Sequence, residues 1–232
     1  MTCADKFREI AVSVTGDLAA RDAVKGVLLV GSTAIGYADE YSDIDLQVVG
    51  QADAGERSIE GIHVEWTPIT FDELEAKLDS WDNDAALYTY AHTNLLYDQL
   101  GLADLFATYD GYPPEIRRKK LYSGWFYGTG NAFDARKAEQ RGDPHVKRCA
   151  SVNAVEQFAA LTYVLDEQFP PYRKWLFRDL PMELPEIDAA LAGDGEALDA
   201  IASTLEPELR EHLTDDRVEN PYLYQPQYER LG

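Results

Sequence analysis

The stretch that decides the fold runs from Val27 to Val49 and reads VLLVGSTAIGYADEYSDIDLQVV. Its first four residues, Val27–Val30, form a continuous apolar run, which is typical of a β-strand buried on both faces. The run stops at Gly31 and Ser32. From about Ser42, apolar and polar residues alternate with a period of two, which predicts a strand with one buried face. The stretch is therefore expected to form two core strands, with a short helix between them.

Three carboxylates are expected to meet on these strands. Asp43 and Asp45 are two residues apart, so their side chains point to the same face, with α-carbons about 6.5 Å apart. A third strand is predicted where apolar and polar residues alternate from Ile62 to Thr67, and Glu65 lies on it. If the second and third strands pair, Glu65 lies about 4.8 Å away across the ladder. The sequence thus predicts a cluster of these three acidic side chains.

Such a cluster predicts a site for divalent cations. Two unit negative charges about 4 Å apart repel by about 4 kcal/mol at an effective dielectric constant of 20, a cost that bound cations remove. Carboxylate oxygens suit Mg²⁺, and two ions about 4 Å apart can stabilise both the attacking and the leaving oxygen of a displacement at phosphorus. Asp43 and Asp45 are the candidates to bridge two such ions. Glu65 is a candidate either for a metal ligand or for the general base that takes the proton of an acceptor hydroxyl.

Gly31 and Ser32 predict a phosphate-binding loop. A glycine lets the backbone approach a triphosphate closely, the Ser32 hydroxyl and nearby amides donate hydrogen bonds, and a helix that begins there adds a favourable dipole. Taken singly, the glycine could merely end a strand and Asp43 could merely cap a turn, whereas their coincidence favours a nucleotide site. A P-loop is excluded, because Gly36 is followed by Tyr-Ala instead of Lys and a hydroxyl residue.

This pairing of Gly-Ser with a later Asp-x-Asp resembles the signature of the DNA polymerase β nucleotidyltransferase superfamily, and Gly36 and Ser42 also fit it. The resemblance implies an enzyme that uses Mg²⁺ to move a nucleoside monophosphate from ATP or another nucleoside triphosphate to an acceptor. It also implies nucleotide contacts for Gly31, Ser32 and Ser42. Members usually carry an aspartate at the third acidic position, so Glu65 departs from the pattern while keeping its ligand chemistry.

Two further stretches, LLYDQL (Leu95–Leu100) and FPPYRKW (Phe169–Trp175), are loosely similar to stretches in relatives of aminoglycoside and lincosamide nucleotidyltransferases. In related two-domain enzymes, a helical domain packs beside the catalytic sheet, and the cleft between them holds nucleotide and acceptor. The resemblance therefore implies an α+β chain. Its catalytic domain, a mixed sheet flanked by helices, is expected over residues 1–112, and a helical bundle that closes the substrate cleft over residues 113–232.

Periodicity in the sequence supports this division. Apolar residues at three- and four-residue spacing over residues 5–22 predict a helix that packs on the sheet. Thr70 and Glu73 form a candidate capping box for a further helix. Beyond Pro114 the pattern is helical, with one long segment to about residue 141 and another over residues 145–168. The turn between these two segments is short enough to make them antiparallel neighbours.

Basic and aromatic residues of the second half give weaker indications. Lys147, with Arg148 and the cluster Arg117–Lys120, is the best candidate to neutralise a triphosphate, although salt bridges to acidic neighbours are the commoner use of such residues. The aromatic segment Tyr122–Tyr127 fits a packed helix interface at least as well as a wall that stacks on substrate.

Composition restricts the function classes further. The chain of 232 residues has 42 acidic and 21 basic residues, a formal charge of -21, which disfavours DNA or RNA as a partner. The acidic residues are scattered, as expected for solubility and for a salt-adapted cytoplasm. We find no secretory signal and no apolar run of membrane-spanning length, so a cytoplasmic protein is expected. Cys3 and Cys149 fit neither a disulfide scaffold nor a zinc site and are expected to behave as small apolar residues.

The leading hypothesis is transfer of AMP, or another NMP, to a hydroxyl of a small and cationic acceptor, as in antibiotic-modifying enzymes. One alternative is adenylylation of a protein, as antitoxin-type minimal nucleotidyltransferases do. Another is a nucleotide-binding module without turnover, against which the intact set of Asp43, Asp45 and Glu65 argues. The expected partners are a nucleoside triphosphate and a small acceptor, and a homodimer is left open.

Overall fold

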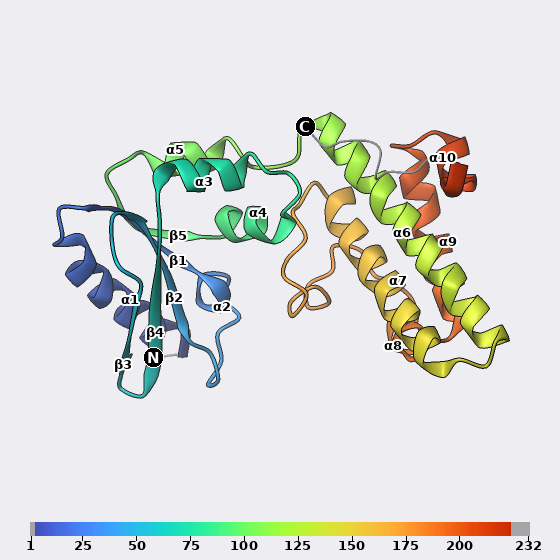
Figure 1. Ribbon diagram of the computed structural model, residues 1–232, viewed down its shortest axis with the longest axis horizontal. Coiled ribbons are helices and arrows are strands. Elements are labelled where there is room, and N and C mark those ends of the chain that lie inside the picture. Colours follow the sequence, from blue (N-terminus) through green and yellow to red (C-terminus); the bar gives the residue numbers. More distant parts are fainter. Residues whose placement is uncertain (1–2, 224–232) are drawn as a thin grey trace. The chain divides into compact units, whose positions relative to one another are not determined.

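The computed structural model describes residues 3–223, and the chain separates into two compact units, Met1–Asp110 and Gly111–Gly232. Each unit has its own architecture (Figure 1). The first is built around a β-sheet, whereas the described part of the second is helical. The predicted α+β class, with an N-terminal sheet domain and a C-terminal helical region, is confirmed.

The sheet of the first unit has five strands in the order β3-β4-β2-β1-β5. Strands β2 and β4 pair in parallel, and the other neighbours pair antiparallel, so the sheet is mixed. The three strands expected in the core are present, and part of the segment between the second and the third forms a further strand, β3. The bounds are Val24–Val30 for β1, Ile44–Gly50 for β2, Gly55–Ile59 for β3, Ile62–Ile69 for β4 and Asn94–Asp98 for β5.

Helices flank this sheet. The longest, α1, buries its apolar stripe, including Ile10, Val14 and Leu18, against a core that the apolar sides of β1, β2 and β4 complete. This is the amphipathic helix that the spacing predicted. The helices of the first unit are α1 (Cys3–Ala19), α2 (Gly31–Ala34), α3 (Phe71–Leu78), α4 (Asp84–Ala91) and α5 (Leu102–Ala107).

The predicted capping box begins α3. The Thr70 hydroxyl accepts a hydrogen bond from the Glu73 amide at 3.2 Å, and the Thr70 amide donates to the Glu73 carboxylate at 2.9 Å. Two amides that the helix itself leaves unpaired are thereby satisfied. These bonds fix the point at which the chain turns from β4 into the helix.

In the second unit, two long helices pack side by side, as the short connection at Gly142 predicted. Gly124 and Gly128 of α6 allow the approach, since an added Cβ would lie 2.7 Å from the Leu161 side chain and 2.5 Å from Phe158 on α7. The elements are α6 (Pro114–Gln140), α7 (Pro144–Leu165), α8 (Ile187–Ala192), α9 (Gly195–Arg210), α10 (Asp215–Glu219) and a 3-10 turn, η1 (Pro221–Leu223).

Two aromatic residues of α6 belong to this packing. Tyr122 and Trp125 are buried; the Tyr122 hydroxyl donates to the Pro221 carbonyl at 2.8 Å, and the Trp125 indole donates to the Val218 carbonyl at 3.0 Å. Packing, rather than a stacking wall, is therefore the role of these two rings.

One expectation about cysteine is wrong. Cys149 is a free thiol on the surface of α7, not a small apolar residue inside the core, because its position on the helix faces away from the stripe that packs on α6. The side chain of Cys3 lies outside the described residues. Within residues 3–223, no helix combines the length and apolarity that crossing a membrane requires.

Candidate functional site

The register of β2 and β4 brings two of the predicted carboxylates together. Asp45 and Glu65 are direct partners in the parallel pair, so their side chains emerge on the same face of the sheet. The neighbouring partners Ile44 and Val64 are fully buried on the opposite face. Asp43 comes two residues before Asp45, just ahead of the first residue of β2. One face of these strands thus builds the core while the other presents acid groups.

Gly31 lies directly against the Asp45 carboxylate. Gly31 has a φ of +69°, a left-handed conformation that favours glycine, and a Cβ added there would lie 2.2 Å from Asp45 Oδ2. The antiparallel register places Val30 opposite Asp45, which explains why the next residue meets this side chain. The predicted phosphate loop and the predicted carboxylate pair are therefore adjacent in the structure.

Burial and a hydrogen bond hold the loop that follows Gly31 in place. Ser32 and Thr33 are both buried, and the Thr33 hydroxyl donates to the Asp43 carbonyl at 3.2 Å. The expected short helix is present as α2, and because it contains only four residues, its peptide dipole adds little. Backbone amides and hydroxyl groups remain as the phosphate-binding groups of this loop.

Ser42 has a local role. Its hydroxyl accepts from the Asp39 amide at 3.0 Å and donates to the Asp39 carboxylate at 2.9 Å, while that carboxylate also accepts from the Tyr41 amide. These bonds close the turn that leads into Asp43. A nucleotide contact for Ser42 stays a prediction.

Sequence reasoning missed two residues beside Glu65. Glu56 on β3 is the antiparallel partner of Glu65, so Glu56, Glu65 and Asp45 form a row across three strands. His63, two residues before Glu65, has its Nε2 atom 3.7 Å from the Glu56 carboxylate and 3.9 Å from the Glu65 carboxylate. The period-two pattern could have placed His63 on the acidic face, whereas the position of Glu56 depends on a strand that its turn-rich sequence hides.

The carboxylates are not gathered into a complete metal-ligand set. Within residues 3–223, no three His, Cys, Asp or Glu side chains are arranged to hold a metal ion. The backbone does place Asp43, Asp45 and Glu65 on one edge of the acidic face, and their hard oxygen donors fit Mg²⁺.

The basic residues that were predicted to contact phosphate have other partners in the second unit. Lys147 pairs with Glu139 and lines a cavity of about 740 Å³ beside Gly193. The Arg117 guanidinium donates to the carbonyls of Val164 at 2.9 Å and Leu165 at 2.6 Å, at the end of α7. These are the structural uses that such residues commonly have. A phosphate contact for Lys147 stays a prediction.

Comparison with known proteins bears on this site directly. Residues 13–98, which include Gly31, Asp43, Asp45 and Glu65, match the family described as a nucleotidyltransferase domain. The chain contains a nucleotidyltransferase domain. This agrees with the resemblance to the polymerase β superfamily, and enzymes of this kind use a nucleoside triphosphate and a divalent metal.

A second match, over residues 83–176, overlaps the end of the first and fits a domain of unknown function (DUF4037). Among curated proteins, no sequence matches the chain. A solved structure, the nucleotidyltransferase-like protein from Exiguobacterium sibiricum 255-15, aligns with 13% identity and a TM-score of 0.49, covering 90% of this chain and 78% of that one. None of these descriptions names an acceptor.

Proposed function

We propose that this nucleotidyltransferase moves an NMP to a hydroxyl group of a small acceptor. The preferred NMP is AMP, taken from ATP. The observation that carries the proposal is the contiguity of three groups: Gly31 lies against the Asp45 carboxylate, and Asp45 pairs with Glu65. A phosphate-binding loop beside paired carboxylates is what transfer of a phosphoryl-linked group requires, since both the triphosphate and its counterions must be positioned.

The acidic residues take the following roles. Asp43 and Asp45 would hold Mg²⁺, and Glu65 would either share in that or accept the proton of the acceptor hydroxyl. Mg²⁺, when bound, supplies positive charge that offsets repulsion among these carboxylates and the triphosphate. The acceptor oxygen bonds to the α-phosphorus, the bond from that phosphorus to pyrophosphate breaks, and the hydroxyl proton passes to Glu65 or to water.

The loop at Gly31 positions the other end of the substrate. The backbone at Gly31 approaches the triphosphate without a side chain in the way, and the Ser32 hydroxyl donates to a phosphate oxygen. Ser32 is 5% exposed, so the residues packed around it restrict its side chain. A fixed donor loses less entropy on binding than a mobile one.

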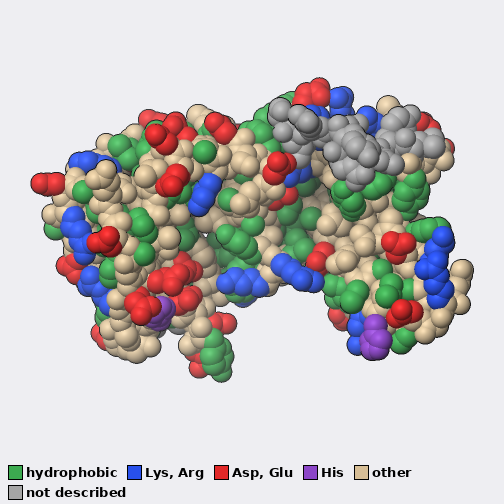
Figure 2. All heavy atoms as spheres, in the orientation of Figure 1, with side chains coloured by type: hydrophobic (Ala, Val, Ile, Leu, Met, Phe, Trp, Pro, Cys, Tyr) green, Lys and Arg blue, Asp and Glu red, His purple; other side chains and the backbone are tan. Residues whose placement is uncertain are grey.

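Charge favours a cationic or neutral acceptor. The first unit has 21 acidic and 6 basic residues, a formal charge of -15. Acidic side chains are spread over the visible face of the molecule (Figure 2). A second polyanion would be repelled, whereas a small cationic alcohol would be attracted.

The test measures pyrophosphate release with Mg²⁺, each of the four labelled nucleoside triphosphates and a panel of small cationic hydroxyl compounds. Asp45→Asn is expected to reduce release by about a hundredfold or more. Asp22→Asn, which removes an equal charge from the turn before β1, is the matched control and should behave like the wild type. Release that is identical in the wild type and Asp45→Asn would refute the proposed role of this site.

A further inference from the structure

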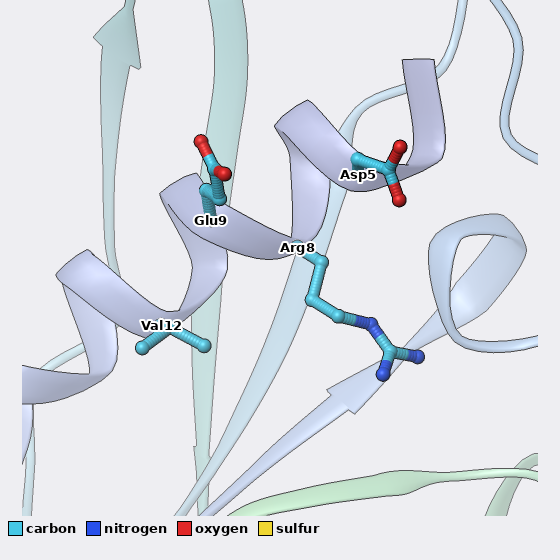
Figure 3. Close-up of a pocket in the computed structure, with 4 residues that line it drawn as sticks. All are labelled: Asp5, Arg8, Glu9 and Val12. Atoms are coloured by element: carbon cyan, nitrogen blue, oxygen red, sulfur yellow. The ribbon is translucent and has the colours of Figure 1, made fainter. Parts of the chain in front are cut away.

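The two faces of the central sheet differ in what covers them near Asp45. One face packs against α1, and the side chains of Ile44 and Val64 are fully buried there. On the exposed side of α1 lies a cavity of about 500 Å³, lined by Asp5, Arg8, Glu9 and Val12 (Figure 3). The helix and the sheet separate this cavity from the Asp45 side chain, which points to the other face. A ligand of the site at Asp45 must therefore bind on that other face.

The other face is covered along only part of its length. At one end α5 covers it: Val49 is fully buried, and a Cβ added at Gly26 would lie 2.6 Å from the Leu102 side chain. At the other end the side chains of Glu56 and Glu65 are 74% and 50% exposed. This second end is an exposed surface of β3 and β4 beside the site, with room for a ligand larger than a metal ion.

The strand order places this exposed end in line with the phosphate loop. Four residues are successive partners across β1, β2, β4 and β3: Val30, Asp45, Glu65 and Glu56. Neighbouring strands lie about 4.8 Å apart, so the α-carbons of Glu65 and Glu56 are about 5 Å and about 10 Å from that of Asp45. Gly31, which follows Val30, lies on the opposite side of Asp45. The loop, the aspartate and the two glutamates thus form one line across the sheet.

The chemistry of transfer gives this line a direction. In a displacement at phosphorus, the attacking and the leaving oxygen lie on opposite sides of the phosphorus. In the proposed function the loop at Gly31 holds the triphosphate, so pyrophosphate leaves on that side and the acceptor hydroxyl approaches from the side of Glu65. The rest of the acceptor then lies over β4 and β3, where Glu56 is the next residue of the line.

The groups on this surface suit a cationic alcohol. The Glu56 carboxylate lies 3.7 Å from His63 Nε2, longer than a hydrogen bond, so its oxygens can still accept from a ligand. Glu65 and Asp45 add negative potential on the same face. Thr67 is exposed in the next row of β4 and adds a hydroxyl that can bond to an alcohol. An ammonium group is therefore favoured at Glu56, and neutral polar groups are favoured beside it.

We propose that the exposed sheet face of the β3–β4 hairpin, at Glu56, Glu65 and Thr67, binds the acceptor and that Glu56 determines specificity for an amino alcohol. The proposal rests on the proposed function and deepens it, because it names the chemistry of the acceptor and the place where it lies. The strand spacing also sets a distance: the ammonium group at Glu56 lies about 5 Å beyond a hydroxyl at Glu65. An amino alcohol such as 4-amino-1-butanol spans this distance.

The test compares 4-amino-1-butanol with 1,4-butanediol, a neutral alcohol of the same length, as acceptors in the presence of Mg²⁺ and ATP. Pyrophosphate release gives kcat and KM for the wild type, Glu56→Gln and Glu60→Gln. Glu60 lies in the turn of the same hairpin and pairs with Lys6 of α1 at 2.8 Å, so its variant is the matched control. In Glu56→Gln the KM for the amino alcohol should rise about twofold to fivefold, the range of an exposed charge pair. The KM for the diol and both kcat values should not change.

Three results would overturn the proposal: equal KM values of the two alcohols in the wild type, an unchanged KM in Glu56→Gln, or the same change in Glu60→Gln. Glu56→Lys provides a second check, because like charges repel and the KM for the amino alcohol should rise further than in Glu56→Gln. A Glu56→Gln protein with a lower melting temperature that loses activity equally with both alcohols would make Glu56 a structural residue of the hairpin.

A binding measurement separates this proposal from the proposed function. The amide chemical shifts of the hairpin are followed by NMR while 4-amino-1-butanol is added with Mg²⁺ and a non-hydrolysable ATP analogue. If no compound of the whole panel yields pyrophosphate but the amino alcohol shifts these amides and Glu56→Gln removes the shifts, the proposed transfer fails and the binding surface stands. If other acceptors yield pyrophosphate while the amino alcohol leaves the hairpin amides unchanged, the transfer stands and the surface fails.

Discussion

The two units of this chain differ in the balance between acidic and basic residues and in how they arrange their carboxylates. The first has 21 acidic residues against 6 basic ones, and it sets Asp45, Glu65 and Glu56 in a row on one face of its sheet. The second has the same number of acidic residues against 15 basic ones, and ion pairs such as Arg136–Asp199 and Lys147–Glu139 join its helices. Neighbouring carboxylates repel one another and destabilise the fold, and a bound cation removes this repulsion. Carboxylates in ion pairs instead hold neighbouring helices together.

The largest expected effect tests the acidic row. Asp45→Asn should reduce transfer by about a hundredfold or more, the scale on which removal of one electrostatic group from an active site acts. Its melting temperature should not fall in the absence of Mg²⁺, because a repulsive neighbour of Glu65 has been neutralised.

Asp199→Asn in the second unit is the counterpart of that change. It breaks the pair with Arg136 and should leave the transfer rate unchanged. Steady-state rates and thermal unfolding of both variants check the contrast. If both lose activity alike, the distinction between repelling and paired carboxylates fails.

The next prediction concerns the effect of two Gly→Ala substitutions on the free energy of unfolding. Gly128→Ala places a Cβ 2.5 Å from the Phe158 ring, and overpacking of this kind should lower the free energy of unfolding by about 1–3 kcal/mol. Gly16→Ala in α1 is the matched control: its Cβ meets nothing within 4 Å, and better helix propensity should raise stability by up to about 1 kcal/mol. Urea unfolding measures both. A stable Gly128→Ala would contradict the close helix contact.

A smaller effect comes from the start of α3. Thr70→Ala should cost about 1 kcal/mol at neutral pH, as loss of an N-cap typically does. Urea unfolding at pH 7 checks this value, with Thr204→Ala, a residue of the α9 interior whose hydroxyl bonds to the Ala200 carbonyl, as a comparison that removes no cap. An unchanged midpoint in Thr70→Ala would show that the cap is not needed.

The same cap should depend on pH through Glu73. Hydrogen bonds from the Thr70 backbone and then its side chain lower the pKa of Glu73 below 4.5. A lowered pKa in the folded state adds stability that is present above pH 4.5 and is lost as pH falls through the folded value. The difference in stability between the wild type and Glu73→Gln should therefore shrink on acidification from pH 7 to pH 3. A difference that stays constant would contradict this linkage.

The smallest effect is confined to alkaline pH. The hydrogen bond to Asp79 raises the pKa of Tyr109 from 10.0 to about 12, with burial adding to the shift. The stability that this bond gives is present below pH 10 and is lost as pH rises towards 12, since the folded state holds the phenolic proton more tightly. Tyr109→Phe should lose this dependence. Ultraviolet titration of the phenolate and unfolding at pH 8 to 12 measure it.

The sequence predicted what depends on local pattern. Three features are local in sequence: the apolar run before Gly31, the alternation after Ser42 and the capping box at Thr70. Each favours one backbone conformation, so the sequence predicted the strands and the start of α3. The pairing of Asp45 with Glu65 was expected only on condition that their strands are neighbours, and the sheet order meets that condition.

What escaped prediction depends on residues far apart in the chain. Glu56 reaches the acidic row because β3 turns back on β4, and Arg8 of α1 bonds to Asn94, which lies 86 positions further along the sequence. Pairing across such distances is set by the packing of the whole sheet, which no local window contains. The exposure of Cys149 likewise depends on which side of α7 meets α6.

The contact between Gly31 and Asp45 offers a way to sort relatives of this chain. Because the carboxylate occupies the volume that a methyl group at position 31 would need, a side chain at that position would force Asp45 into another rotamer. A homologue with any larger residue in place of this glycine has no room for an aspartate at position 45 in the same rotamer. The glycine thus keeps the Asp45 carboxylate in the orientation that it has beside the loop.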